Sequence, residues 1–246
     1  MTTDVADVFF DNPILMKHVR SRLRPAEALP WAAVVLVLSA CVAWASVQVD
    51  WIGSSAAVMM LLGMQMVILA VGGAKQINTS FGGVRETGLL DFHRVSPLPP
   101  SAVALGFFLG APVREYALAA VTLPFALFCS VALDTFDTWK GIAWLLQTEV
   151  AVVMTSWLVH AVTMLACLTR KTGRGSILGT VGLLIVLLFL GYMGSFGLYF
   201  GARWLLEENP GLNFLGRKIP WLPWLLIYEL PALGFLGLAV ERLGRL

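Results

Sequence analysis

Charged side chains are scarce in this chain of 246 residues: 13% of the residues are Asp, Glu, Lys or Arg, and 58% are hydrophobic. An ordinary soluble domain is about a quarter charged. A chain this apolar cannot cover its own surface with polar groups, so its solvent must be largely lipid. The net charge is only +2 and no long basic run is present, which argues against nucleic acid as a partner.

Cysteine is equally sparse, and its three copies fall inside separate apolar runs at Cys41, Cys129 and Cys167. Their spacing matches neither a set of zinc ligands nor the framework of a disulfide-rich domain. We therefore expect three buried cysteines that pack as small hydrophobic residues, and no metal site.

Sequence motifs that carry chemistry are missing as well. The phosphate-binding pattern G-x-x-x-x-G-K-[ST] does not occur, and Gly72-Gly73-Ala74-Lys75 is better explained as the glycine-rich end of a membrane helix. The patterns G-x-S-x-G and H-x-x-x-H and paired Asp residues inside apolar runs are also absent. We expect a chain that is not an enzyme by itself and that binds no cofactor of its own.

Long apolar runs dominate what is present. A spanning helix needs about 20 predominantly apolar residues, and six segments meet that length: 30–49, 54–74, 102–133, 141–168, 177–200 and 221–240. The first begins near Pro30 with no small-residue cleavage site behind it, so we expect no cleavable signal peptide. The predicted fold class is an all-α membrane protein with a six-helix transmembrane domain over residues 30–246.

Residues 1–29 are predicted to form a separate cytoplasmic segment. Asn12-Pro13 is typical of a helix start, and the apolar residues that follow recur at helical spacing opposite basic ones. This pattern predicts a short basic amphipathic helix in the membrane interface. A solvated tail is the alternative.

Basic residues are distributed unevenly between the two sides of the predicted spans. Twelve lie on the side of the N-terminus: Lys17, Arg20, Arg22, Arg24, Lys75, Arg85, Arg94, Arg170, Lys171, Arg174, Arg242 and Arg245. Four lie on the other side: Lys140, Arg203, Arg217 and Lys218. Because cytoplasmic loops carry an excess of Lys and Arg, both termini are predicted to be cytoplasmic.

Two connections are longer or more apolar than a simple turn. Residues 75–101 form a long cytoplasmic connection that becomes helical in character, and 201–220 mix apolar residues with Glu207 and Glu208. The second segment is too short to span twice, and we expect a broken or re-entrant helix there, which needs protein or water around its backbone.

The stretch 85–97 is the most informative part of the sequence. It is predicted to form a short, charged, amphipathic helix that ends at Ser96-Pro97. Leu89, Phe92 and Val95 can line one face, which leaves the charged side chains for water or for another protein. An ordinary loop helix is the alternative interpretation.

With this stretch the chain resembles the membrane-spanning subunit of type-2 ABC exporters. That family carries an acidic-x-Gly-Thr-x-acidic sequence, then Ser/Thr-Pro and an aliphatic residue, between its second and third helices. The matching positions are Glu86, Gly88, Asp91, Ser96, Pro97 and Leu98, and the family's Thr is Leu89 here. The interfacial helix, six spans, internal termini and re-entrant segment match the family layout as well.

The resemblance implies that residues 85–97 are the coupling helix that docks on an ATPase subunit, through Arg85, Glu86, Gly88, Asp91, His93, Arg94 and Pro97. It implies that two permease chains, identical or related, form a pathway in the inner (plasma) membrane, lined by the first, second and fifth spans. ATP and Mg would be bound by the separate ATPase chain. The apolar interior favours an amphipathic or lipid-like substrate.

Ionisable residues inside membrane spans are expensive and are functional candidates by default. Here they are Arg114, Glu115, Glu149, His160 and Glu229. Adjacent helix positions do not face each other, so we expect no mutual ion pair between the first two. Glu149 and Glu229 could line an exit path, or they could make structural hydrogen bonds that hold the broken segment in place. His160 could relay protons or be a hydrogen-bonded interior histidine.

Two other functions stay open at this point. An intramembrane enzyme is disfavoured because its sequence patterns are absent. A membrane scaffold or signalling partner with a permease-like fold and no transport activity is the main alternative, and Leu89 leaves room for it.

Overall fold

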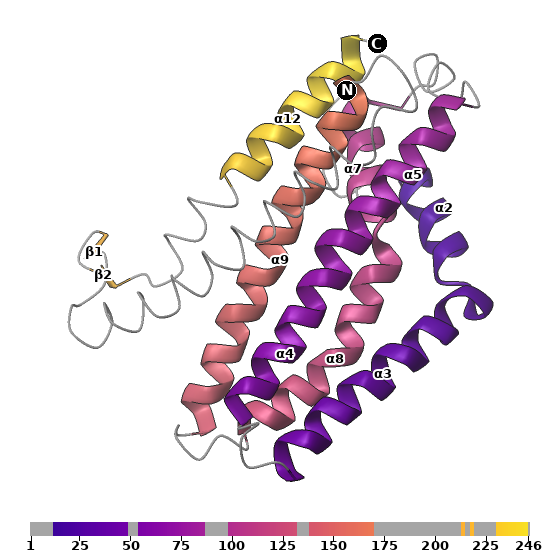
Figure 1. Cartoon of the computed structure of the whole chain (residues 1–246). Coiled ribbons are helices and arrows are strands. Elements are labelled where there is room, and N and C mark those ends of the chain that lie inside the picture. The colour runs from indigo at the N-terminus through magenta and orange to yellow at the C-terminus, as the bar shows by residue number, and fades with distance from the viewer. Residues whose placement is uncertain are drawn as a thin grey trace.

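The computed structural model describes residues 12–48, 54–86, 98–131, 138–169, 213–214, 217–218 and 230–245. In chain order these residues form α2 (Pro13–Arg22), α3 (Pro25–Gln48), α4 (Ser54–Met66), the π-helix η1 (Val67–Gly72), α5 (Gly73–Glu86), α7 (Pro100–Gly110), α8 (Val113–Val131), α9 (Thr138–Thr169), the strands β1 (Asn213–Phe214) and β2 (Arg217–Lys218), and α12 (Leu230–Arg245) (Figure 1). Almost all of the described chain is helical.

Four helical stretches in the described part are long and apolar enough to cross a membrane: Pro25–Gln48, Ala56–Val84, Val113–Val131 and Thr148–Leu168. They coincide with the first four predicted spans, so the prediction of a multi-pass, helical membrane protein is confirmed in this coarse form. The predicted span 177–200 and residues 221–229 of the last span lie outside the described residues. The six-span layout therefore stays a prediction.

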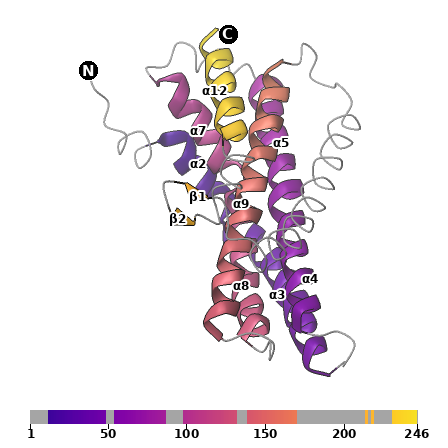
Figure 2. The same ribbon diagram turned by 90° about the vertical axis from the view of Figure 1, so that its left-hand side faces the viewer.

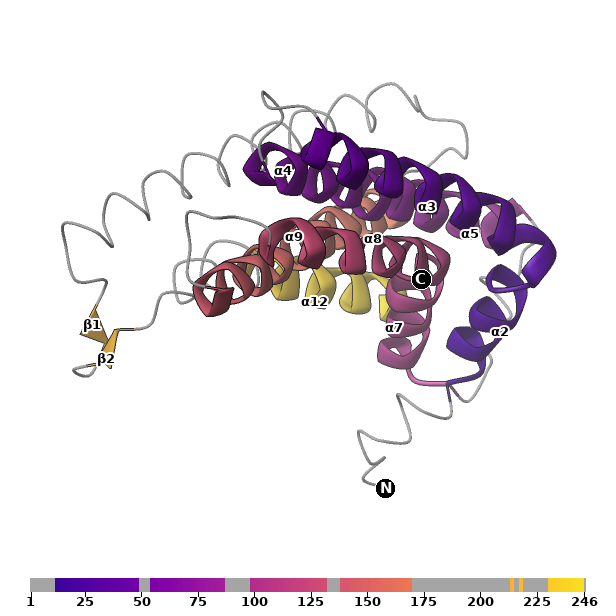
Figure 3. The same ribbon diagram turned by 90° about the horizontal axis from the view of Figure 1, so that it is seen from below.

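The second span forms the centre of the bundle. α4, η1 and α5 follow one another as a single long rod, and α8 and α9 pack along it (Figures 1 and 2). α3 packs on α8 and α4, and α12 packs on α9. Seen along the bundle, α3 and the α4–α5 rod form one row, and α7, α9 and α12 form another (Figure 3).

The ends of the helices alternate between the two ends of the bundle. α2, the end of α5, the start of α7 and the C-terminal end of α12 lie together at one end, and the end of α3 and the start of α4 lie at the other (Figure 1). The N-terminal helix, the residues flanking 87–97 and the C-terminus are therefore on the same side. Which side is cytoplasmic stays a prediction from the basic residues.

The third predicted span is not one helix. Residues 102–133 were expected to form a single element, but α7 ends at Gly110, a turn follows at Ala111 and Pro112, and α8 begins at Val113. Proline has no backbone N–H, and its ring clashes with the carbonyl group four residues earlier, so a helix tends to break there. Only α8 is long enough to span, and α7 packs instead against α2 and α12.

α2 is docked on α7. The side chain of Asn12 accepts hydrogen bonds from the backbone N–H of Ile14 (3.0 Å) and of Leu15 (3.2 Å), which caps the helix as predicted. Its Nδ2 also donates to the carbonyl of Ala102 in α7 (2.7 Å). A Cβ placed on Gly106 of α7 would lie 2.7 Å from the Cβ of Ile14, so glycine is needed for this close approach.

β1 and β2 fall in the segment 201–220, for which a broken or re-entrant helix was predicted. They pair antiparallel, with Asn213 opposite Lys218 and Phe214 opposite Arg217. At these four residues the helical expectation is wrong. Pro210, Gly211 and Gly216 in the sequence give a physical reason, because proline and glycine are the poorest helix formers. The rest of 201–220 lies outside the described residues.

Candidate functional site: a polar seam inside the bundle

The residues predicted to dock on an ATPase are mostly outside the described part of the chain. Gly88, Asp91, His93, Arg94 and Pro97 lie there, as does the intramembrane candidate Glu229. Arg85 and Glu86 are the last two residues of α5, and only their backbone is described. The site that can be built from described side chains is therefore the intramembrane one.

Four predicted residues, Arg114, Glu115, Glu149 and His160, lie along one interface. They line the face that α4, η1 and α5 share with α8 and α9, together with uncharged polar residues that the sequence analysis did not single out. We call this set the polar seam; its members are Gln65, Gln76, Asn78, Arg114, Glu115, Tyr116, Thr122, Glu149, His160 and Cys167.

At one end of the seam, Gln65 of α4 joins α8 and α9. Its Nε2 donates to the hydroxyl oxygen of Thr122 at 2.5 Å, and the Thr122 hydroxyl donates to the carbonyl of Ala119 at 2.7 Å. Gln65 also contacts the carboxyl group of Glu149. One side-chain oxygen of Gln65 and one of Glu149 are buried with no hydrogen-bond partner among the described residues.

At mid-height of the seam, His160 of α9 inserts against the π-helix. The residue is fully buried, and its Nε2 lies 2.8 Å from the carbonyl oxygen of Leu69 in η1. Since a carbonyl oxygen only accepts, Nε2 carries the hydrogen. In the neutral ring Nδ1 is then the acceptor, and the hydroxyl of Tyr116 donates to it across 3.3 Å. Both ring nitrogens are thus paired, one to η1 and one to α8.

Two consecutive glycines make room for this arrangement. A Cβ on Gly73 would lie 2.1 Å from Nε2 of His160, and a Cβ on Gly72 would lie 3.0 Å from Cγ of Glu115. Each glycine therefore receives one polar side chain from a neighbouring helix. The sequence analysis explained Gly72-Gly73 as a glycine-rich helix end; in the structure the pair is the contact surface of the second span.

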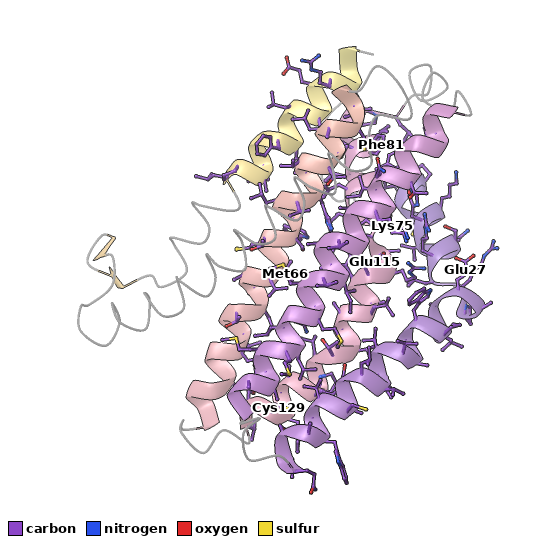
Figure 4. The ribbon with its side chains drawn as sticks, in the orientation of Figure 1. Glu27, Met66, Lys75, Phe81, Glu115 and Cys129 are labelled. Atoms are coloured by element: carbon purple, nitrogen blue, oxygen red, sulfur yellow. The ribbon has the colours of Figure 1, made fainter. Side chains whose placement is uncertain are left out.

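Glu115 of α8 lies on the other side of the same junction (Figure 4). Its Oε1 accepts from Nη2 of Arg114 at 2.8 Å and from Nε2 of Gln76 at 3.2 Å. The expectation that Arg114 and Glu115 would not pair is wrong. The reason is that the long arginine side chain folds back along its own helix, a freedom that the geometry of adjacent Cβ atoms does not capture. Its guanidinium also lies 5.9 Å from the ring centre of Trp31 in α3.

The last pair of the seam joins α9 to α5, where the thiol of Cys167 donates to the side-chain oxygen of Asn78 at 3.2 Å. All three cysteines are free thiols, but only Cys129 is buried. The expectation of three buried cysteines is wrong for Cys41, which is exposed on α3, and for Cys167, which is half-buried. α3 packs on α8 and α4 through one side, and its other side meets no other helix among the described residues.

Chemically the seam is a set of interhelical hydrogen bonds, which stabilise helix association in lipid. A search restricted to Asp, Glu, Lys, Arg and His could not find Gln65, Gln76, Tyr116 or Thr122. The available signal was a neutral polar residue inside an otherwise apolar run, placed on the helix face that carries the glycines.

Neither a protein-family model nor a curated protein sequence matches this chain. The functional argument therefore rests on the chain's own residues and on the arrangement of its helices.

Proposed function

We propose that this chain is the membrane-spanning subunit of an ATP-driven exporter of the type-2 ABC class, which docks on a separate ATPase subunit through residues 85–97. The observation that carries the proposal is the sequence Glu86-x-Gly88-x-x-Asp91, followed by Ser96-Pro97, between the second and third spans. Two such chains, identical or related, would form the pathway in the inner membrane, and ATP and Mg would be bound by the ATPase.

The fold supports this proposal through the position of the flanking helices. α5 and α7, which bracket residues 87–97, end and begin on the side of the bundle that holds α2 and the C-terminal end of α12 (Figure 1). The segment between them would then meet a partner from the side that holds α2 and the C-terminal end of α12. α5 continues without interruption into η1 and α4, so a push on residues 85–97 would act on the second span directly.

The substrate class follows from the character of the helices. The described spans are apolar over most of their length, with mean hydropathy of 1.3 to 2.1, and several of their buried polar residues pair with one another inside the seam. A pathway between such helices suits an amphipathic or lipid-like molecule better than a small ion, which would need a continuous polar lining.

The test is co-purification from membranes of the native host. A tagged wild-type chain in mild detergent is expected to bring down a protein that hydrolyses ATP, and the double variant Glu86→Ala/Asp91→Ala is expected to lose it. Asp134→Ala/Asp137→Ala is the matched control: it also removes two carboxylates, but from the connection between α8 and α9, and it should retain the ATPase.

Failure of wild type to bind an ATPase, with the chain monodisperse and folded, would overturn the proposal. A membrane scaffold or signalling partner without transport activity would then be the better account. Loss of the ATPase from both double variants would also count against a specific role for Glu86 and Asp91.

A further inference from the structure

The second span contains a backbone irregularity at the level where its polar contacts concentrate. Residues Val67–Gly72 form a π-helix between two α-helical segments. A π-helical turn accommodates one more residue than an α-turn, has poorer hydrogen-bond geometry, and occurs most often at functional positions. Left to itself, an apolar run of this kind would be expected to form a regular α-helix, so something outside the segment must favour the π form.

The side chain of His160 lies against this segment. The imidazole of His160 occupies the space beside Gly73 and bonds the Leu69 carbonyl at 2.8 Å. That carbonyl is also approached by the backbone N–H of Gly73, which is shared between the carbonyls of Leu69 and Ala70. The imidazole N–H is thus a second donor to a carbonyl that keeps its backbone hydrogen bond, and a side chain that engages the backbone ladder is a recognised cause of local helix distortion.

The imidazole is itself held in place by two further helices. Phe108 of α7 and Tyr116 of α8 contact the ring edge-on, each with centroids 6.1 Å apart, and the Tyr116 hydroxyl is paired with Nδ1. The ring is fully buried. Because its position is fixed from α7, α8 and α9 together, the ring can impose a conformation on η1 instead of yielding to it.

We propose that His160 is a positioning residue that holds the second span in its π-helical form, and that withdrawal of its ring lets α5 re-register as a continuation of α4. When the π turn becomes an α turn, every position after η1 rotates by about 100° around the helix axis and moves by about 1.5 Å along it. Exposed Thr79 and buried Ile77 would then present different faces to the bundle. The claim that this rotation governs ATPase coupling rests on the proposed function, whereas the rotation itself does not.

The rotation of α5 can be measured by the distance between two spin labels, in a chain whose three native cysteines are replaced by Ala. One label replaces Thr79, on α5 beyond η1, and the other replaces the exposed Leu238 on α12. A second pair, with labels at Met60 and Leu238, reports on α4 before η1 and serves as the reference. We expect His160→Ala to shift the Thr79–Leu238 distribution and to leave the Met60–Leu238 distribution unchanged.

Three further variants separate this role from simple loss of stability. His160→Gln keeps an N–H that can donate to Leu69 and should restore the wild-type distribution. Gly73→Ala puts a methyl group in the place of the imidazole and should shift the distribution by a second route. Thr163→Ala removes a buried hydroxyl from α9 that donates to the Val159 carbonyl of its own helix, and should change neither distribution.

An unchanged Thr79–Leu238 distribution in folded, monodisperse His160→Ala would overturn the proposal. With the ATPase partner bound, the same variant is expected to hydrolyse ATP with a loss of substrate moved per ATP. If the distribution shifts and coupling is intact, the link to coupling is overturned and the conformational role stands. If no ATPase binds wild type, the proposed function fails, while the spin-label result still decides the role of His160.

Discussion

The first and second spans are equally apolar but lie in different surroundings. Their mean hydropathy is 2.1 for Pro25–Gln48 and 2.0 for Ala56–Val84, yet 17% of the first window is buried against 50% of the second. Hydropathy identifies a span but says nothing of which neighbour it meets. The two spans differ in specific residues. The second span carries Gly72 and Gly73, which allow neighbouring helices to approach closely, and Gln65 and Gln76, which pair with polar side chains of those helices.

The largest effect that tests this comparison is expected at Gly73. Gly73→Val places branched carbon atoms where the His160 imidazole lies, and we expect a loss of about 3 kcal/mol in the free energy of unfolding, typical of severe overpacking. Ala33→Val, an enlargement on the exposed face of α3, should cost less than about 0.5 kcal/mol. Reversible denaturant unfolding in detergent measures both. Similar losses at the two sites would contradict the difference in packing between the first and second spans.

A second prediction concerns the way the outer span is fastened at its start. α2, which leads into α3, is packed on α7, where a Cβ on Gly110 would lie 3.1 Å from the Cβ of His18. Burial lowers the pKa of His18 to about 4, assisted by the positive charges of Arg22 and Lys17. The docked state therefore favours the neutral ring.

The direction of the pH effect follows from this shift. An undocked histidine titrates near 6.5, so the docked form binds fewer protons between pH 6.5 and about 4, and docking weakens as the pH falls through this window. We expect a loss of about 1 kcal/mol, after allowance for solvent screening of a partly exposed group. Amide hydrogen exchange of residues 13–22 at pH 7 and pH 4.5, expressed as protection factors that remove the intrinsic pH dependence of exchange, measures it. His18→Gln should have the same protection factors at both values; a persistent difference would assign the effect elsewhere.

A smaller effect is expected for the pairing of Gln65 with Thr122. A double-mutant cycle with Gln65→Leu and Thr122→Val should give a coupling energy of about 0.6 kcal/mol, the average for interhelical hydrogen bonds in membranes. Ser39 of α3 donates to Val35 within its own helix, so a cycle of Ser39→Ala with Thr122→Val should show no coupling. Coupling in the second cycle would mean that α3 is more tightly integrated than its exposure indicates.

The smallest effect is expected on the outer face of α3. Trp44 is 70% exposed in the isolated chain, so Trp44→Ala should change the free energy of unfolding by less than about 0.5 kcal/mol. The measurement is made at low protein concentration. A larger loss that grows with protein concentration would show that a second copy covers this face.

The parts of the fold that the sequence predicts well depend on nearby residues. The first four apolar runs form helices, and Asn12 caps α2, because hydropathy and capping are decided within one helical turn or one continuous run. The break at Pro112 was within reach of the same reasoning, since proline acts on its own helix. The interpretation of 102–133 as one span gave length more weight than it gave that proline.

The parts that the sequence does not predict depend on partners far along the chain. η1 follows from His160, which is 91 positions away from Leu69, and Gln65 finds Thr122 across 57 positions. No local pattern specifies either pairing. Of the predicted intramembrane residues, the structure brings His160, Arg114 and Glu115 to the junction of η1 and α5 and leaves Glu149 beside Gln65. The coupling residues beyond Glu86 lie outside the described part and stay a prediction.

The length of the second span has a mechanical consequence. Ala56–Val84 has 29 residues, about 44 Å of helix at 1.5 Å per residue, whereas the hydrocarbon core of a bilayer is about 30 Å thick. The helix must tilt in the bilayer or project beyond its hydrocarbon core. Its two ends are α4 and the part of α5 that includes Phe81 (Figure 4). A displacement at one end of this helix reaches the other end only if the segment between them resists bending. The segment between those two ends is η1, which the imidazole ring of His160 contacts at Leu69.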